Sequence, residues 1–518
     1  MGLASRQYSR SMHSDIVVPE STPQPKSKES NLFPLLERAA AQWPGDTALV
    51  RAAQTFTFQQ LKRAAEQLAA ELVNSAIKPG TKVGLMCPNG PDYVIGSFAL
   101  FLVEAIVVPI FPGLKEREIA SLAGELGLDA YCYSPQFENQ LPRRLSGTRV
   151  NVDLQAGELV LQVERCERSD NTEIDRHRLA CLGAPLIRFT SGTTSKAKGV
   201  IIPQASMMEY TYRFASVYSI QKGDCILNLL SMAHIFYQVT AGMLRGAKLV
   251  IEDASKIDAV LRAIRDHRVT HIEAAPSFYT MLLAEKNVCA EDFRPLKYIT
   301  SCGAPLPDSV ADSFRDRFGR EIVQRYGLTE TGPVLINTNE DPSKRGSLGV
   351  AAPGCEIRLK DESDTSADVG EIQVRCAGLF HGYYLPWTPR EEVLADGWFR
   401  TEDVARRDAD GYYSMTGRTK TMINVGAVKV FPDELEAILL SHSAVKEALV
   451  FASPEPRFGE VPHAKVVLRS GSTANARELL RYVNRDLGVF KSLRHIEVVK
   501  EIGKTHTGKL KRYESETR

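Results

Sequence analysis

The sequence predicts an α/β protein with a large N-terminal domain and a smaller α+β domain at the C-terminus, and two patterns support this prediction. Apolar residues recur at helical spacing in "NLFPLLERAAAQW" and "FQQLKRAAEQLAAELVNSA". By contrast, "KVGLMC", "AIVVPIF", "KLVIED" and "HIEAAP" are short and bounded by Gly, Pro or charged residues, as strands are. Strands that alternate with helices form parallel sheets covered by helices, and their functional sites lie at the carboxyl ends of the strands.

The predicted second domain begins near residue 420. The segment "GYYSMTGRTKTMINVGAVKVFPDELEAILL" is followed by a stretch with its own helices and strands, which has a suitable size for a small domain. We therefore predict domains at 31–419 and 420–518, with a cleft between them. Residues 1–30 are polar and rich in Ser, Pro and Lys, so we predict a disordered tail that cannot bury a core.

Composition narrows the class of protein. Of 518 residues, 43% are hydrophobic and 25% are charged, and the formal net charge of +1 does not favour nucleic acid as a partner. The nine cysteines are scattered singly, which favours a reducing, cytoplasmic location over a disulfide framework or structural zinc. The best candidate for a membrane span, "VIGSFALFLVEAIVVPIFPG", contains Glu104 and two prolines. We predict a buried helix followed by a buried strand there, and no stable membrane insertion.

One loop has the composition of a phosphate-binding loop. The stretch 188–200, "RFTSGTTSKAKGV", places hydroxyl side chains, glycines and lysines between two apolar segments. It does not match the nucleotide loop G-x-x-x-x-G-K-[S/T], which needs a glycine directly before the lysine. Here Gly192 is followed by Thr193, Thr194 and Ser195, so the residue directly before Lys196 is a serine. On composition alone, the loop is either a phosphate loop or a flexible linker.

Four further stretches resolve this ambiguity through a family resemblance. They are "RYGLTETG" (325–332), "GWFRTEDVARRDADGYY" (397–413), "GRTKTMINVGAVKVFPDELE" (417–436) and "KTHTGKLKR" (504–512). With the loop, and in this order, they resemble the acyl-adenylate-forming superfamily, which includes acyl-CoA synthetases, aryl-CoA ligases, luciferases and peptide-synthetase adenylation domains. The resemblance implies a large N-terminal domain of three subdomains with a β-barrel-like part, and a mobile C-terminal domain. It also implies a two-step reaction through an acyl-AMP.

The resemblance assigns a nucleotide-binding role to two groups of residues. The phosphate loop and its flank would contact the β- and γ-phosphates of ATP: Thr190, Ser191, Gly192, Thr193, Thr194 and Lys198. A second group would surround the adenine and the ribose: Gly303, Ala304, Pro305, Tyr326, Gly327, Asp403 and Arg418. Within this second group, Tyr326 would stack on the adenine, and Asp403 would bind both ribose hydroxyls.

The resemblance also implies catalytic roles. Thr329 would bind the α-phosphate, and Glu330 would hold Mg²⁺, a hard cation that prefers carboxylate and phosphate oxygens. Lys509 would be brought by the small domain to the carboxylate and the α-phosphate. His234 resembles a gate residue beside the acyl carbonyl, and a packed core histidine is the alternative.

The small domain would rotate between the two half-reactions. Lys420 occupies the hinge position, two residues after the ribose arginine Arg418. The thiol channel would contain Gly426 and Ala427, and Ala427 stands where the family carries glycine. A methyl group at that position would hinder a close-packed channel.

The resemblance places the acyl pocket around seven residues: His234, Tyr237, Gly242, Ser301, Gly303, Gly327 and Gly332. Peptide-synthetase domains bind the amino group of their substrate with an acidic residue in the segment that corresponds to "SMAHIFYQVTAGM". This chain has no acid there, which argues against an α-amino acid as substrate. We expect a carboxylic acid with an apolar body, such as a fatty, aryl or polyketide- or terpenoid-like acid.

Several positions depart from the family pattern. Ser195 and Ala197 replace a glycine and a proline in the loop, Glu402 replaces the central glycine of a "TGD" pattern, and Cys376 replaces another glycine. These departures indicate a divergent member. They leave open an acyl-CoA ligase, a ligase that loads a phosphopantetheine carrier protein or performs one half-reaction, and a weakened nucleotide- or acyl-binding protein. We expect ATP, Mg²⁺ and CoA as cofactors, and a monomer or homodimer.

Overall fold

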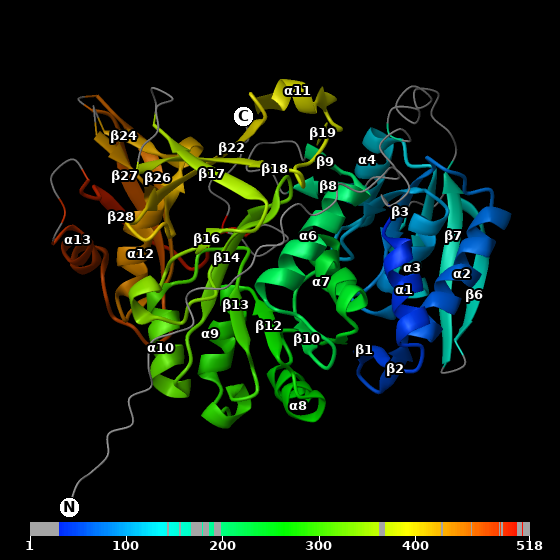
Figure 1. Cartoon of the computed structure of the whole chain (residues 1–518). Coiled ribbons are helices and arrows are strands. Elements are labelled where there is room, and N and C mark those ends of the chain that lie inside the picture. The colour runs from blue at the N-terminus through cyan, green and yellow to red at the C-terminus, as the bar shows by residue number, and fades with distance from the viewer. Residues whose placement is uncertain are drawn as a thin grey trace, which may run out of the picture.

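Figure 1 shows the computed structural model of the chain. The residues that it describes are 31–141, 145–154, 157–166, 179, 186–190, 198–361, 368–425, 428–456, 458–485, 487, 491–504 and 510.

The first nine-stranded sheet has a parallel centre and antiparallel edges. Its strand order is β20-β19-β9-β8-β4-β3-β5-β7-β6, and β3, β4, β5 and β8 pair in parallel. In that order the bounds are Thr388–Pro389, Gly382–Tyr383, Lys198–Ile202, Leu186–Thr190, Ile106–Pro109, Lys82–Met86, Ala130–Tyr133, Gly157–Cys166 and Leu145–Leu154. The strand before the predicted phosphate loop, β8, therefore lies in the interior of a sheet.

The second nine-stranded sheet is also parallel at its centre. Its order is β16-β15-β14-β13-β12-β10-β11-β1-β2, with parallel pairing from β14 through to β1. The bounds, in the same order, are Val350–Ala351, Gly332–Ile336, Val323–Leu328, Tyr298–Ser301, His271–Ala274, Cys225–Asn228, Lys248–Ile251, Thr47–Arg51 and Gln54–Thr57.

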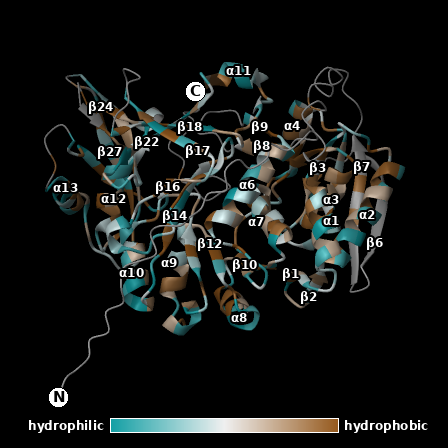
Figure 2. Ribbon diagram, in the orientation of Figure 1, coloured by the Kyte–Doolittle hydropathy of each residue, from teal (hydrophilic) through white to brown (hydrophobic). Residues whose placement is uncertain are grey.

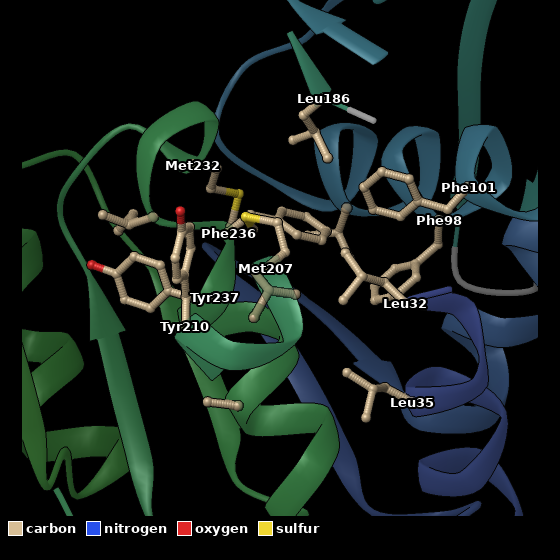
Figure 3. Packing of buried hydrophobic residues seen from close by; sticks show 14 of the residues in the cluster. Leu32, Leu35, Phe98, Phe101, Leu186, Met207, Tyr210, Met232, Phe236 and Tyr237 are labelled. Atoms are coloured by element: carbon tan, nitrogen blue, oxygen red, sulfur yellow. The ribbon is translucent and has the colours of Figure 1, made fainter. Parts of the chain in front are cut away.

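Helices fill the space between these sheets and cover their outer faces (Figure 1). The inner helices share one apolar cluster with both sheets: α1 (Phe33–Gln42), α2 (Phe58–Asn74), α3 (Pro91–Leu102), α6 (Gln204–Val217) and α7 (Met232–Arg245). Figure 3 shows part of this cluster around Phe236. The outer helices of the second sheet form another cluster: α8 (Ile257–His267), α9 (Pro276–Ala284) and α10 (Asp308–Phe318). On the first sheet, α4 (Glu116–Leu126) and the 3₁₀ turn η1 (Pro135–Gln140) pack with buried tyrosines.

Local sequence explains where some of these helices begin. At the start of α2, the Thr57 hydroxyl accepts a hydrogen bond from the Gln60 amide (3.2 Å), and the Gln60 side chain accepts one from the Thr57 amide (2.8 Å). This reciprocal pair satisfies two amide groups that a helix start otherwise leaves unpaired. The predicted buried helix and strand are also confirmed, because α3 is almost entirely buried and leads into β4.

A third, antiparallel sheet connects the second sheet to the C-terminal part. Its order is β17-β18-β22-β21, and β23 pairs with β22. The bounds are Cys355–Lys360, Val369–Cys376, Trp398–Arg407, Leu394–Ala395 and Tyr413–Arg418. The remaining short helical elements of the described chain are η2 (Ala290–Phe293), η3 (Pro342–Lys344), α11 (Arg390–Val393) and η4 (Thr419–Thr421).

The C-terminal part has a sheet and an apolar cluster of its own. The sheet order is β25-β24-β27-β26, with β28 beside β27, and α12 (Pro432–Ser441) and α13 (Ala476–Asn484) contribute residues to the cluster. The strand bounds are Val428–Val430, Ile423–Val425, Gly459–Leu468, Val445–Glu455 and His495–Val498. Figure 2 shows hydrophilic residues on the outward helices α10 and α13.

The α/β class, with large N-terminal sheets and a smaller C-terminal domain, is confirmed. No helix among the described residues combines the length and the apolar character that a membrane crossing requires. The domain boundary at residue 420 stays a prediction.

Candidate active site

A tight hairpin between β14 and β15 forms one part of the site. The Leu328 amide donates to the Thr331 hydroxyl (3.0 Å), and the Thr331 amide donates to the Leu328 carbonyl (3.2 Å), so Glu330 lies in a closed turn. A Cβ atom at Gly327 would lie 2.1 Å from the carbonyl oxygen of Gly332. Only glycine permits this approach of the two backbones, and the approach fixes the position of Glu330.

The Glu330 carboxylate is partly buried and has a defined partner. Its oxygen accepts a hydrogen bond from the Tyr383 hydroxyl (3.1 Å), and its backbone carbonyl accepts one from the Phe380 amide (2.8 Å). The Lys198 ammonium lies 4.8 Å from the centre of the Tyr383 ring. Burial raises the pKa of the Glu330 carboxyl, while Tyr383 and the charge of Lys198 oppose the shift. A bound cation would therefore stabilise this carboxylate.

A buried carboxylate on β22 connects three strands. Asp403 lies opposite Arg418 in the β22–β23 register, and the Arg418 Nε atom is 2.6 Å from Asp403 Oδ1. The Tyr326 hydroxyl on β14 donates to Asp403 Oδ2 (2.7 Å). Burial raises the pKa of Asp403, and the charge of Arg418 and the hydrogen bond from Tyr326 lower it. These contacts bring three predicted nucleotide-binding residues into one cluster.

The residue before Asp403 has an unusual backbone conformation. Glu402 has φ of 63°, in the left-handed region that glycine adopts without strain. Its amide donates to Glu371 Oε1 (3.0 Å), and the other oxygen of Glu371 accepts from Arg400 Nε (2.9 Å). The Glu371 carboxylate thus holds the strained backbone in place. This observation explains why a "TGD" pattern has glycine at the position of Glu402.

The cluster fits a nucleotide. Asp403 is 1% exposed, and its Oδ1 atom accepts no hydrogen bond from the described residues, although it lies within ion-pair distance of Arg418. A buried carboxylate oxygen whose contact with Arg418 is an ion pair without hydrogen-bond geometry can also accept from a ligand hydroxyl, such as those of ribose. Within the described ranges, no group of three or more His, Cys, Asp or Glu side chains could hold a metal ion. A cation at Glu330 would therefore need phosphate oxygens as further ligands.

Comparison with known families gives the same result. The sequence model described as "AMP-binding enzyme" matches residues 36–384, and the one described as "AMP-binding enzyme C-terminal domain" matches residues 434–509. The chain belongs to the AMP-binding enzyme family. The resemblance stated from the five motifs is thus confirmed.

Curated relatives and solved structures cover nearly the whole of this AMP-binding enzyme. The chain is 28% identical over 484 residues to a feruloyl-CoA synthase of Amycolatopsis sp, covering 91% of this chain and 96% of the relative. It is 28% identical over 544 residues to a long-chain-fatty-acid–CoA ligase of Bacillus subtilis, covering 96% and 95%. The o-succinylbenzoate CoA synthetase of Bacillus subtilis with its acyl-adenylate is 26% identical, with a TM-score of 0.77 and coverage of 92% and 96%.

The structure places some predicted site residues and leaves others undescribed. Gly303, Ala304 and Pro305 follow β13 and are exposed, and Thr329 is partly buried in the β14–β15 turn. Thr190 ends β8 opposite Lys198, and Lys420 lies in η4. Seven predicted residues lie outside the described residues: Ser191, Gly192, Thr193, Thr194, Gly426, Ala427 and Lys509.

The predicted acyl-pocket residues do not all have the same surroundings. His234 is exposed near the start of α7, so the alternative of a packed core histidine is wrong. Tyr237 is buried and hydrogen-bonds to Glu273 (3.3 Å). Gly242 lies near the end of α7, where a Cβ atom would be 3.1 Å from the Ala247 carbonyl oxygen. Ser301 ends β13 with a buried hydroxyl that has no hydrogen-bond partner among the described residues.

Sequence reasoning missed two residues of the site. Tyr383 binds Glu330 although they are 53 positions apart, and Glu371 supports Glu402 from 31 positions away. Neither belongs to a motif with a recognised spacing. The sequence offered one indication for Glu371, namely that it is a charged residue on β18, the strand that pairs with β22.

The strained backbone at Glu402 leads to a first prediction. Glu402→Gly should raise the free energy of unfolding by about 1 kcal/mol. Glycine removes the left-handed backbone strain, and the greater flexibility of glycine in the unfolded state offsets part of this stabilisation. Glu402→Ala is the matched control, since it removes the same side chain and keeps the strain. Urea unfolding of the three proteins measures the effect. Equal gains for Gly and Ala would contradict the explanation.

The buried carboxyl of Glu330 leads to a second prediction. Its pKa in the folded state lies above its ordinary value of 4.5, so ionisation destabilises the native state as the pH rises through and above that value. Glu330→Gln should therefore raise the Tm of the ligand-free protein at pH 8 and change it little near pH 4.5. The same change should lower Mg-ATP-dependent activity by on the order of 100-fold, because it removes the carboxylate that the resemblance assigns to Mg²⁺. A lower Tm for the variant at pH 8 would show that the ionised carboxylate stabilises the fold.

Proposed function

We propose that this AMP-binding enzyme is an acid–thiol ligase that activates a carboxylic acid with Mg-ATP and transfers the acyl group to CoA. The observation that supports it most directly is the cluster of Tyr326, Asp403 and Arg418 beside the turn of Glu330. The names of its relatives, a feruloyl-CoA synthase and a fatty-acid–CoA ligase among them, agree with this reaction.

The first half-reaction would join the acid to AMP. A carboxylate oxygen attacks the α-phosphorus, the bond from that phosphorus to the bridging oxygen breaks, and pyrophosphate leaves with the electron pair. This step depends on positioning and charge neutralisation, which suits hydroxyls, amides and cations more than a protein nucleophile. Asp403 and Arg418 would position the ribose, and Lys509 would neutralise the developing charge. When bound at Glu330, Mg²⁺ would neutralise phosphate oxygens.

The second half-reaction would use another orientation of the small domain. The thiol sulfur, after it loses its proton, attacks the acyl carbonyl, and AMP leaves as the carbonyl–oxygen bond breaks. We propose that rotation at Lys420 withdraws Lys509 and presents the loop of Gly426 and Ala427 to the pantetheine arm. His234 would lie at the entrance of the acyl group.

The acid itself is proposed to have an apolar body. The segment 231–243 supplies aromatic and aliphatic residues and no acidic side chain, so it has no partner for an α-amino group. Two alternatives remain distinct proposals: transfer to the phosphopantetheine thiol of a carrier protein, and a protein that binds the nucleotide without turnover. The presence of Glu330, Asp403, Arg418 and Lys509 speaks against the second.

A panel assay tests the proposed function. We expect ATP–pyrophosphate exchange with at least one acid in a panel of fatty, aryl and dicarboxylic acids, and AMP formation that accelerates when CoA is added. Hydroxylamine, which traps acyl-AMP as a hydroxamate, provides an independent readout. Exchange without acceleration by CoA would favour the carrier-protein alternative, and no exchange with any acid would contradict the proposal.

Two substitutions separate the half-reactions. Lys509→Ala should lower adenylation by roughly 100-fold or more and leave thioester formation from a supplied acyl-AMP nearly intact, because the lysine acts in one conformation. Asp403→Ala should weaken both half-reactions, because Asp403 would bind the ribose of the nucleotide in both of them. Rapid-quench measurements with ATP and with synthetic acyl-AMP supply the rates. An equal loss in both steps for Lys509→Ala would contradict the assigned role.

A further inference from the structure

Arg188 is a buried cation in the middle of β8, two residues before the strand ends at Thr190. It is 5% exposed. One guanidinium nitrogen donates to the His234 carbonyl (3.3 Å), and the other lies 3.5 Å from the sulfur of Met207. The Nε atom has no acceptor among the described residues. A carbonyl and a thioether give a guanidinium little of the stabilisation that water provides.

Another buried arginine of the core, Arg325, is better compensated. Arg325 forms a bidentate ion pair with Glu273, with Nε 2.8 Å from one carboxylate oxygen. Arg213 resembles Arg188 instead: one nitrogen donates to the carbonyls of Thr331 (3.3 Å) and Pro333 (3.4 Å), and its other two nitrogens have no acceptor among the described residues. In the described part of the chain, no carboxylate forms an ion pair with Arg188. An arginine cannot lose its proton in a protein, so its charge remains uncompensated.

Tyrosines surround this guanidinium in place of acids. Burial lowers the pKa of Arg188, and Tyr93, Tyr210 and Tyr237 oppose this shift. The Tyr210 hydroxyl is buried and also lacks a hydrogen-bond partner among the described residues. Figure 3 shows Tyr210 and Tyr237 on one side of Phe236 and Phe98 and Phe101 on the other. An unpaired cation and an unpaired hydroxyl therefore lie in one region of the core.

This region coincides with the proposed acyl pocket. Arg188 binds the backbone of His234, and the Tyr210 ring packs on Gly332, where a Cβ atom would lie 2.3 Å from the ring. His234 and Gly332 both belong to the acyl pocket of the proposed function. A ligand that reaches Arg188 from this pocket would meet its guanidinium and the Tyr210 hydroxyl, with Arg213 5.8 Å from the centre of the Tyr210 ring.

We propose that Arg188 binds a second anionic group on the substrate, so that the preferred acids are dicarboxylic acids with an apolar body between the two carboxylates. The proposal rests on the proposed function. One carboxylate is activated by ATP, and the other pairs with Arg188 and accepts a hydrogen bond from Tyr210. A carboxylate matches the planar guanidinium and satisfies both unpaired groups at once.

The test compares acids that differ only at the far end. The probes are linear diacids of four to ten carbons and the three benzenedicarboxylates, each beside its monoacid, and 4-carbamoylbenzoate as the neutral counterpart of terephthalate. Pyrophosphate release gives kcat/KM for each. We expect at least one diacid to exceed its monoacid by roughly 100-fold, because a site built for a polar group strongly rejects an analogue that lacks it.

Variants assign this preference to the guanidinium. Arg188→Met should lower the ratio of kcat/KM for the diacid to that for its monoacid by roughly 100-fold. Arg188→Lys should keep part of this ratio, since lysine retains the positive charge but lacks the paired N–H donors of the guanidinium. Arg320→Met is the control, because it removes a partly buried guanidinium that donates to the carbonyls of Phe293 (3.0 Å) and Leu296 (2.8 Å) and that, in the described part of the chain, hydrogen-bonds to none of the proposed pocket residues. It should lower the Tm and keep the ratio. A ratio that falls in the Arg188 variants and not in the control shows that Arg188 binds the substrate and does not only stabilise the fold.

Several outcomes would overturn the proposal. If the wild-type protein activates monoacids as well as every diacid, Arg188 does not select the substrate, although the proposed function stands. If Arg188→Met raises the KM for ATP and slows all acids equally, the guanidinium serves the phosphates. If no acid is activated, the proposed function fails and this inference with it. If Arg188→Met does not fold, the wild-type preference for terephthalate over benzoate and 4-carbamoylbenzoate decides.

Discussion

The contact between Asp403 and its two partners organises the candidate site. Asp403 and Arg418 face each other on β22 and β23, while Tyr326 reaches the same carboxylate from β14 in a different sheet. A buried carboxylate is stable only when a positive charge or hydrogen-bond donors compensate it, so Asp403 links the two sheets through the donors that it needs. The turn of Glu330 follows Tyr326 by four residues and is positioned by the same contact.

The site keeps charges that the fold alone would not favour. Burial raises the pKa of both Asp403 and Glu330, which means that their ionised forms are less stable in the native protein than in water. Glu402 adds backbone strain beside them. Such features persist where a ligand compensates them, because a bound cation or hydroxyl restores the interactions that burial removes. At these positions, the features that the proposed activity needs therefore lower the stability of the ligand-free protein.

The sequence predicted the fold class and the motif residues better than their partners. Periodicity identified α2, and an apolar run interrupted by Glu104 and two prolines identified α3 and β4, because these are local patterns. The order of five motifs predicted the family. Tyr383 and Glu371 were missed because their roles come from contacts between strands distant in the chain. Arg188 was seen only as part of a loop, since no pattern in one sequence indicates that an arginine will be buried without a carboxylate. Glu402 was noted as a departure, and its strain required backbone angles.

The position of Arg188 on β8 has a consequence for both ends of the substrate. The same strand ends at Thr190, at the start of the predicted phosphate loop, and β9 begins with Lys198 directly opposite. A rigid strand in the interior of a sheet thus carries a cation for the far end of the acid and leads into the loop for ATP. An acid anchored at Arg188 would have its reactive carboxylate held at a fixed distance from the α-phosphate. Anchoring of this kind converts the binding of a remote group into orientation of the reacting one, and this orientation adds to the charge neutralisation that the nucleotide site supplies.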